Sequence, residues 1–227
     1  MFSLSSSVFL IIFLLSCLLF YRNFSKIIRN IKLGRDSGVF VNKRERWKNV
    51  LFIAFGQKKM FKKPIVAILH LVVYLGFVII NIEIIEIVLD GILGTHRILF
   101  SPKWSGLYNF CINSFEILAL LVLLACIVFL IRRNIIKIKR FWSPEMKGWP
   151  TSDANLILIF EVLLMSAFLI MNAADLALQN SAHIEPYLVL KYPNTGNFVI
   201  SGMISSIMQE ISISNLILIE RFCWWFH

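Results

Sequence analysis

The sequence has few cysteines, and none of them is close to another. Cys17, Cys111, Cys126 and Cys223 are never within three residues of each other. This spacing excludes CxxC-type zinc or iron–sulfur ligation within the chain. We therefore expect all four cysteines to behave as small apolar residues.

Acidic residues are also scarce. The 13 Asp and Glu residues are outnumbered by 23 Lys and Arg residues, which leaves a net charge of +10. Such a charge can indicate a nucleic-acid partner, but its placement argues against one. Thirteen of the cations lie between Arg22 and Lys63, and six lie between Arg132 and Lys147. Two basic segments on one side of a membrane are typical of cytoplasmic loops, so we expect no nucleic-acid partner.

Apolar residues are abundant instead. They make up 58% of the 227 residues, and the mean hydropathy of +0.77 lies outside the range of soluble proteins. Runs of about 20 apolar residues match a hydrocarbon core about 30 Å thick. We find four such runs and the beginning of a fifth: Val8–Phe20 (extended by the uncharged residues 1–7), Ile65–Leu89, Tyr108–Ile131, Ala154–Leu178 and Phe222–His227. These runs predict an all-α membrane protein, a bundle of four complete transmembrane helices plus a truncated fifth.

The chain divides into three parts. Residues 1–21 form a first span, which is retained because no positive charges precede its apolar run. Residues 22–63 form a basic cytoplasmic segment, with a short surface helix expected around Trp47–Phe55. Residues 64–227 form the remaining membrane domain. Its last six residues cover only about 9 Å of helix, so we expect the sequence to be a fragment that is incomplete at its C-terminus.

Two histidines lie in the apolar runs, His70 in the second and His227 in the last. An ionisable residue inside a membrane span is by default a functional hypothesis. Histidines on facing helices can hold a haem, whose iron takes axial imidazole ligands. The alternative is a neutral histidine that is hydrogen-bonded within the bundle.

Counting residues along the spans separates these two histidines in depth. His70 is about 8 Å below the cytoplasmic face. If Glu220 and Arg221 mark the outer interface, His227 is about 9 Å below the outer face, which leaves about 13 Å between the two levels. The pair then marks two sites. If the last span begins near Asn215 instead, the depths nearly match; we favour the first interpretation because it keeps the charged pair at the interface.

Acidic and amide side chains also lie in the spans, most of them in the outer half of the bilayer: Asn81, Glu83, Glu86, Asn113, Glu116, Glu161, Asn172 and Asp175. Each unpaired carboxylate costs about 2–3 kcal/mol there. A cluster of them suits a quinone or proton site. The alternative is hydrogen bonding from helix to helix combined with interfacial placement.

Four segments together resemble one membrane domain: Pro64–Asn81 (PIVAILHLVVYLGFVIIN), Gly94–Arg97 (GTHR), Lys137–Pro150 (KIKRFWSPEMKGWP) and Trp224–His227 (WWFH). The chain from about Gln57 onward is similar to the cytochrome b-like domain of the nitrate reductase gamma subunit superfamily. Within this superfamily, the chain looks like the fused membrane iron–sulfur oxidoreductases that are similar to the heterodisulfide reductase membrane subunit. The chain is also similar to the haem-containing dehydrogenase that takes electrons from electron-transfer flavoprotein.

This resemblance implies haem b with His70 and His227 as axial ligands of the iron, and His96 as a further cofactor-binding candidate. The gamma subunit has a second histidine ten residues after the first in span two, where this chain has Ile80. In the family, iron–sulfur clusters follow the last span, so they would belong to a missing C-terminal region or a partner subunit. The implied partners are membrane lipid, quinone, an iron–sulfur domain and electron-transfer flavoprotein.

The resulting hypothesis is a respiratory oxidoreductase module in a bacterial inner membrane, which passes electrons between a cytoplasmic iron–sulfur module and quinone. We expect no catalysis at a substrate carbon within this chain alone. The alternative is a non-haem polytopic scaffold, or a transporter with an intramembrane relay of histidine and carboxylates. Inverted repeats and Gly/Pro-broken spans, which are typical of transporters, are missing from spans two to four.

The charge distribution predicts the topology, with the N-terminus outside. A single cysteine introduced at Lys43 or Lys139 should react with an impermeant thiol reagent only from the cytoplasmic side. One introduced in Gly91–Leu107 or Tyr187–Gly196 should react from the outside. External labelling at Lys139 would contradict the assignment and invert every depth given above.

Overall fold

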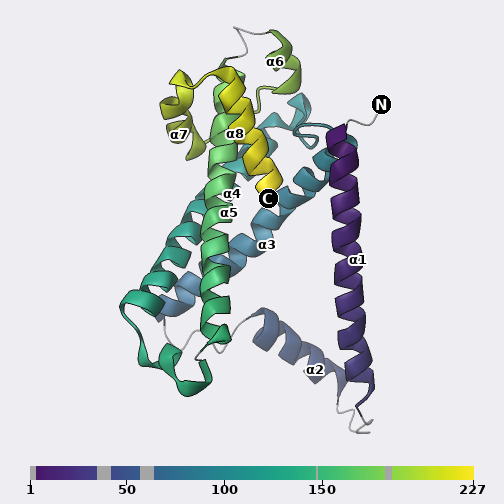
Figure 1. Ribbon diagram of the computed structural model, residues 1–227, viewed down its shortest axis with the longest axis vertical. Helices are drawn as coiled ribbons and strands as arrows, with labels where there is room; N and C mark the ends of the chain where they lie inside the picture. Colours follow the sequence, from purple (N-terminus) through teal and green to yellow (C-terminus); the bar gives the residue numbers. More distant parts are fainter. Residues whose placement is uncertain (1–3, 35–41, 57–63, 147, 182–185) are drawn as a thin grey trace. The chain divides into compact units, whose positions relative to one another are not determined.

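The computed structural model describes residues 4–34, 42–56, 64–146, 148–181 and 186–227, and across these ranges it contains helices and no strand (Figure 1). Four helical segments in this part of the chain are long and apolar enough to cross a membrane. They are built on α1 (Leu4–Lys32), α3 (Pro64–Leu93), α4 (Ser105–Leu130) and α5 (Trp149–Asn180). The predicted all-α membrane protein with four complete transmembrane helices is therefore confirmed.

Short helical elements connect and follow these four: α2 (Lys43–Asn49), η1 (Val50–Phe55), η3 (Pro102–Trp104), η4 (Ile131–Ile135), η5 (Lys139–Trp142), η6 (Pro144–Met146), α6 (Pro186–Lys191), α7 (Ser201–Ile207), η7 (Met208–Glu210) and α8 (Ile213–Phe226). α2 and η1 confirm the short helix predicted around Trp47–Phe55. The segment between α5 and α8 forms α6, α7 and η7.

The long helices follow from uninterrupted apolar runs and from where their prolines fall. Pro64 opens α3 and Pro150 is the second residue of α5, positions where a helix does not use the missing N–H group. α1 continues past Phe20, the predicted end of the first apolar run, to Lys32. No glycine or proline interrupts the chain before Gly34, so the helix extends into the basic segment.

The chain forms two compact units, one of residues 1–68 with 89–95 and one of residues 69–88 with 96–227. In the first unit the ring of Phe9 in α1 lies directly against Gly91 in α3. A β-carbon at position 91 would overlap that ring, so the glycine permits the close approach.

In the second unit, α5 packs against several other helices. It contacts α4, α7 and α8, and α8 runs beside the C-terminal half of α5 (Figure 1). Ala173, Ala174 and Ala177 of α5 are buried, and their short side chains let the neighbouring helices come close. The core around them is completed by Leu178, Leu188, Tyr192, Met208 and Leu216.

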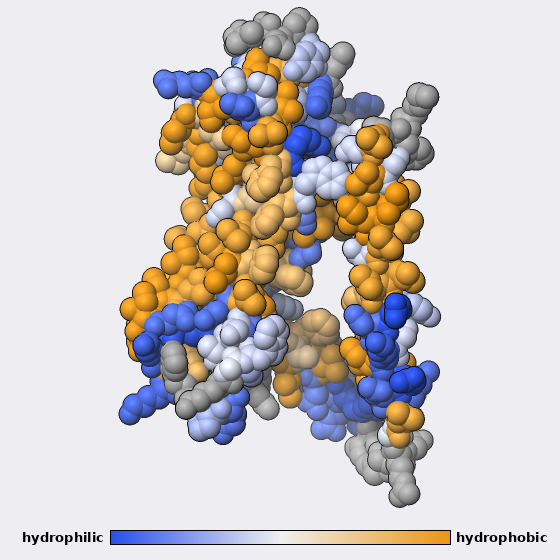
Figure 2. Space-filling model, viewed as in Figure 1, coloured by the Kyte–Doolittle hydropathy of each residue, from blue (hydrophilic) through white to orange (hydrophobic). Residues whose placement is uncertain are grey.

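The outer surfaces of α4 and α5 are apolar, whereas hydrophilic residues gather where η4–η6 connect the two helices (Figure 2). Large apolar side chains such as Leu121, Leu124, Ile157 and Phe160 are exposed. Apolar surface of this extent is typical of contact with lipid or another chain, not with water. The inward faces carry the polar residues described below.

α8 begins at Ile213, well before the start near Phe222 that the sequence interpretation favoured. With 14 residues it is shorter than a membrane span, so a truncated fifth transmembrane helix is not established. Glu220 and Arg221 consequently lie inside the helix. Glu220 is 1% exposed, pairs with Arg221 and accepts a hydrogen bond from the Tyr192 hydroxyl at 3.5 Å. Because these contacts satisfy Glu220 and Arg221, the two residues can lie inside the protein and not at the water interface.

The packing of α3 on α4 predicts a specific stability effect. Gly76 of α3 faces Val122 of α4 so closely that a β-carbon at position 76 would overlap a Val122 methyl group. Val122 is fully buried. Gly76→Ala should therefore lower the free energy of unfolding by about 1–3 kcal/mol through overpacking. In thermal unfolding of the detergent-solubilised protein, Val122→Ala in the same chain should restore part of this loss, and independent effects of the two substitutions would contradict the contact.

Candidate functional site

Arg97, in the loop after α3, is at the centre of a buried polar cluster. Only 6% of its surface is exposed. Its Nε donates to Asp175 Oδ2 at 3.0 Å, Nη2 donates to Asn172 Oδ1 at 2.6 Å, and Nη1 donates to the Tyr108 hydroxyl at 3.4 Å. Its backbone has φ of 57°, a left-handed conformation that is uncommon outside glycine. The surrounding contacts stabilise this strained residue.

Asp175 of α5 is the main counter-ion of Arg97. It has no exposed surface, and its two oxygens are both occupied. Oδ2 is 3.0 Å from Arg97 Nη2, and Oδ1 is 3.1 Å from Nε2 of His96. The His96 ring also packs edge-on against Tyr192, with 4.9 Å between ring centroids. His96 is thus committed to the Arg97 cluster.

Two further carboxylates are fully partnered. Glu86 of α3 accepts from the Tyr108 hydroxyl at 2.8 Å and from the Leu99 backbone N–H at 3.0 Å. Glu116 of α4 accepts from the backbone N–H groups of Ile200 and Ser201 at 2.9 and 3.2 Å, and from the Asn172 amide at 3.4 Å. These bonds join α3, α4 and α5 to the loop after α3 and to the start of α7.

The fourth carboxylate, Glu83 of α3, has a weaker set of contacts. Its Oε1 is 3.5 Å from Arg97 Nη1, and its Oε2 is buried without any hydrogen-bond partner. The cluster therefore contains four acidic groups around one guanidinium. Burial alone would lower the pKa of Arg97, but the acidic groups around it, Tyr108 and Asp175 first, raise that pKa well above its ordinary value. The Arg97 guanidinium is therefore charged at neutral pH.

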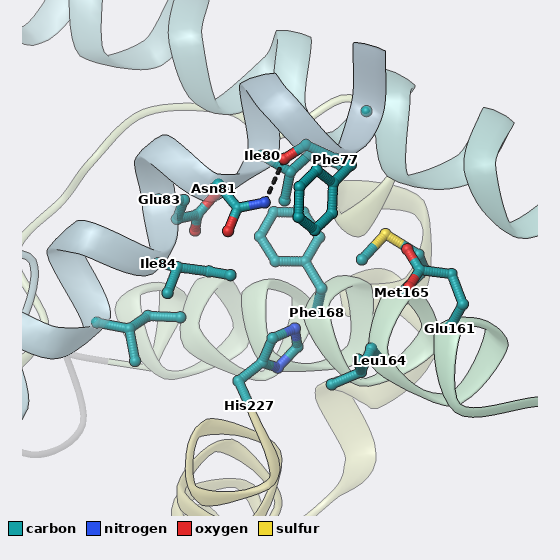
Figure 3. A pocket seen from close by; sticks show the side chains of 12 residues that line it. Phe77, Ile80, Asn81, Glu83, Ile84, Glu161, Leu164, Met165, Phe168 and His227 are labelled. Atoms are coloured by element: carbon teal, nitrogen blue, oxygen red, sulfur yellow. Dashed lines mark hydrogen bonds between the residues drawn. The ribbon is translucent and has the colours of Figure 1, made fainter. Parts of the chain in front are cut away.

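A cavity of about 130 Å³ lies between α3, α5 and the end of α8 (Figure 3). His227 closes one side of it, with its ring edge-on to Phe168 at 6.1 Å between centroids. Nδ1 of His227 is 3.3 Å from the Cys223 carbonyl oxygen, whereas Nε2 is buried and has no hydrogen-bond partner. The other polar residues along the cavity are Asn81, Glu83 and Glu161.

His70 is not among the residues that line this cavity. It lies near the start of α3, exposed, with its ring 4.5 Å from that of Phe129. Ile80 lines the cavity together with His227 and is ten residues, about 15 Å of helix, beyond His70. The structure thus leaves His70, His96 and His227 in three different surroundings. Lys58, Lys59, Lys62 and Lys63, which the sequence places just before α3, lie outside the described residues.

A larger groove of about 480 Å³ runs between α3 and α4. Its walls are mostly apolar, with Trp104, Leu107 and Phe110 exposed at its edge. Glu86 and Tyr108 belong to its lining, and Glu83 lines both this groove and the cavity beside His227.

The described cysteines are all free, and no group of three or more His, Cys, Asp or Glu residues within the described ranges is arranged to hold a metal ion.

The role of Arg97 is the feature that sequence reasoning missed. The only signal for this role in the sequence was a single arginine next to spans that carry an excess of acidic residues in the outer half of the bilayer. Glu86, Glu116 and Asp175 have partners on other helices or loops. These contacts fit the alternative interpretation of the carboxylates, in which they form hydrogen bonds from helix to helix.

The fold and the cluster define a class: a multi-pass α-helical membrane protein whose inward faces carry a buried ionic network. No protein-family model, curated protein or solved structure matches the chain. The likeness to the gamma subunit superfamily therefore stays a prediction.

The contacts of Arg97 predict a large loss of stability when it is removed. Arg97→Ala should leave Asp175 and Glu83 buried without their counter-ion, at a cost of about 3–5 kcal/mol in the free energy of unfolding. Lys103→Ala removes the same charge from an exposed residue a few positions further along, so it serves as the matched control. Equal unfolding temperatures for both variants, measured by circular dichroism in detergent, would contradict the role of Arg97.

Proposed function

We propose that this chain is a membrane b-haem electron-transfer module of a respiratory oxidoreductase, with His227 as an axial ligand of the haem iron. The supporting observation is the buried Nε2 of His227, which faces a cavity and has no hydrogen-bond partner. Buried nitrogens of this kind are normally satisfied, so one without a partner requires an explanation.

The other ring nitrogen supports the same assignment. A histidine that ligates a metal usually donates its second N–H to a carbonyl or carboxylate, which fixes the tautomer and the ring orientation. Nδ1 of His227 is 3.3 Å from the Cys223 carbonyl oxygen. When Nδ1 carries the proton, the lone pair is on Nε2 and is directed into the cavity.

His227 would supply one ligand to the iron of a haem, but the cavity of about 130 Å³ is smaller than a macrocycle, so binding would require the surrounding helices to move apart. The walls beside His227 are largely apolar, with Phe77, Ile80, Ile84 and Phe168 among them, which would give a bound macrocycle apolar contacts. No second histidine lines this cavity in the described part of the chain. A bound haem supplies reversible one-electron transfer, and the protein's part is to hold the iron and tune its potential through ligation and burial.

His70 is the second proposed ligand, for a haem nearer the cytoplasmic side. About 15 Å of helix separates His70 from the level of His227, so two haems at these levels would carry electrons across about half of the hydrocarbon core. Phe129 packs against the His70 ring and would orient it.

We further propose the orientation that the basic segments favour, with the N-terminus outside a bacterial inner membrane. The cytoplasmic cations would attract an acidic electron donor. An iron–sulfur module, in a continuation of the chain or a partner subunit, would dock there, with electron-transfer flavoprotein as its upstream donor. The groove between α3 and α4 offers an apolar entrance with Glu83, Glu86 and Tyr108 in its lining, which suits a quinone head group.

Absorption spectroscopy tests this proposal. Isolated membranes that contain the full-length protein should show a b-type Soret band. His227→Ala should remove one haem, because no other histidine among the described residues lines that cavity, and His70→Ala should remove a different one. Added imidazole should restore the band in His227→Ala by occupying the vacated position.

His96→Ala is a suitable control, since His96 is engaged by Asp175. It should leave the haem spectrum unchanged even where it lowers stability. Wild-type haem content in His227→Ala and in His70→Ala would overturn the proposal. The non-haem scaffold or transporter interpretation would then replace it.

A further inference from the structure

Glu83 differs from the other three carboxylates of the Arg97 cluster. Both oxygens of Glu86, Glu116 and Asp175 accept hydrogen bonds or ion pairs. Glu83 is also buried, with 3% of its surface exposed. However, its Oε1 has one contact of 3.5 Å to Arg97, and its Oε2 has no hydrogen-bond partner. A buried carboxylate oxygen without a donor is costly as an anion, whereas a protonated carboxyl carries its own O–H group.

The position of Glu83 is equally distinctive. It lines the cavity beside His227, which also contains Asn81 and Glu161, and it lines the groove between α3 and α4. The cavity of about 130 Å³ has room for several water molecules, and its polar side chains offer them hydrogen bonds. Figure 3 shows the Glu83 and Asn81 side chains on the same side of that cavity.

The charges around Glu83 act in opposite directions. Arg97 favours the anion, but Asp175 is the nearer partner of that guanidinium, at 3.0 Å against 3.5 Å. The remaining ionisable groups that face Glu83 are acids or a histidine, from α3, α4, α5 and α8: Glu86, Tyr108, Glu116, Glu161, Asp175 and His227. Additional negative charge from the acids favours the neutral carboxyl.

We propose that Glu83 is a proton-exchanging carboxyl that connects the cavity beside His227 with the groove between α3 and α4. A proton delivered by water in one space forms the O–H bond at Oε2. That bond breaks when the proton passes to water in the other space, and no electron is transferred in either step. Glu86, Glu116 and Asp175 keep their hydrogen bonds throughout. This role goes beyond the proposed function and requires no bound haem.

Dicyclohexylcarbodiimide provides a direct test on the wild-type protein. This apolar reagent adds the O–H of a neutral, accessible carboxyl across one of its C=N bonds, so the modified residue gains the whole reagent mass. In the purified full chain in bicelles, Glu83 should be labelled several-fold faster than Glu86, which lies one turn away on the same helix. The labelling rate should fall as the pH rises, and peptide mass spectrometry identifies the site.

Substitutions complete the test. Glu83→Gln should lose the label and Glu83→Asp should retain it, because aspartate keeps the titrating group. Equal labelling of Glu83 and Glu86, or no labelling of Glu83 at any pH, would overturn the proposal. The label is measured independently of the haem spectrum. A chain that lacks a Soret band but is labelled at Glu83 would therefore refute only the haem assignment, and the reverse result would refute only this one.

Discussion

The second compact unit depends on one buried cation. The Arg97 guanidinium contacts Asp175 and Asn172 on α5 and Tyr108 on α4, and it reaches Glu83 on α3. A buried charge is tolerated only when it is paired and hydrogen-bonded. Since those partners come from three helices, satisfying Arg97 fixes the relative positions of these helices near the loop. The strained backbone of Arg97 is held by the same contacts.

The network divides the polar residues of the unit into two kinds. Glu86, Glu116 and Asp175 have donors on both oxygens, so they stabilise the bundle and leave nothing free for chemistry. His227 Nε2 and Glu83 Oε2 are buried without partners, and both residues line one cavity. Functional groups are expected where local hydrogen bonding is incomplete, because stability alone would have satisfied them. The proposed haem ligand and the proposed proton-exchanging group are these two residues.

Much of the fold could be predicted from the sequence, because apolar runs such as Ile65–Leu89 are long enough to define spans without any tertiary information. The sequence also predicted that carboxylates lie in the outer half of the bilayer. Their partners could not be predicted, because pairing depends on how the loop after α3 folds back, and helical periodicity says nothing about that. The start of α8 was misplaced for a related reason: Glu220 was expected at the water interface, whereas Tyr192 and Arg221 satisfy it inside the protein.

A double-mutant cycle on Arg97 and Asp175 tests the central claim most directly. The free energies of unfolding of the wild type, Arg97→Met, Asp175→Leu and the double variant would be measured under one set of detergent conditions. The account predicts that the double variant is more stable than the sum of the single losses implies, with a coupling of about 3 kcal/mol, because each single change leaves a buried charge unpaired. Additive losses would contradict it and would remove Arg97 as the organising residue of the bundle.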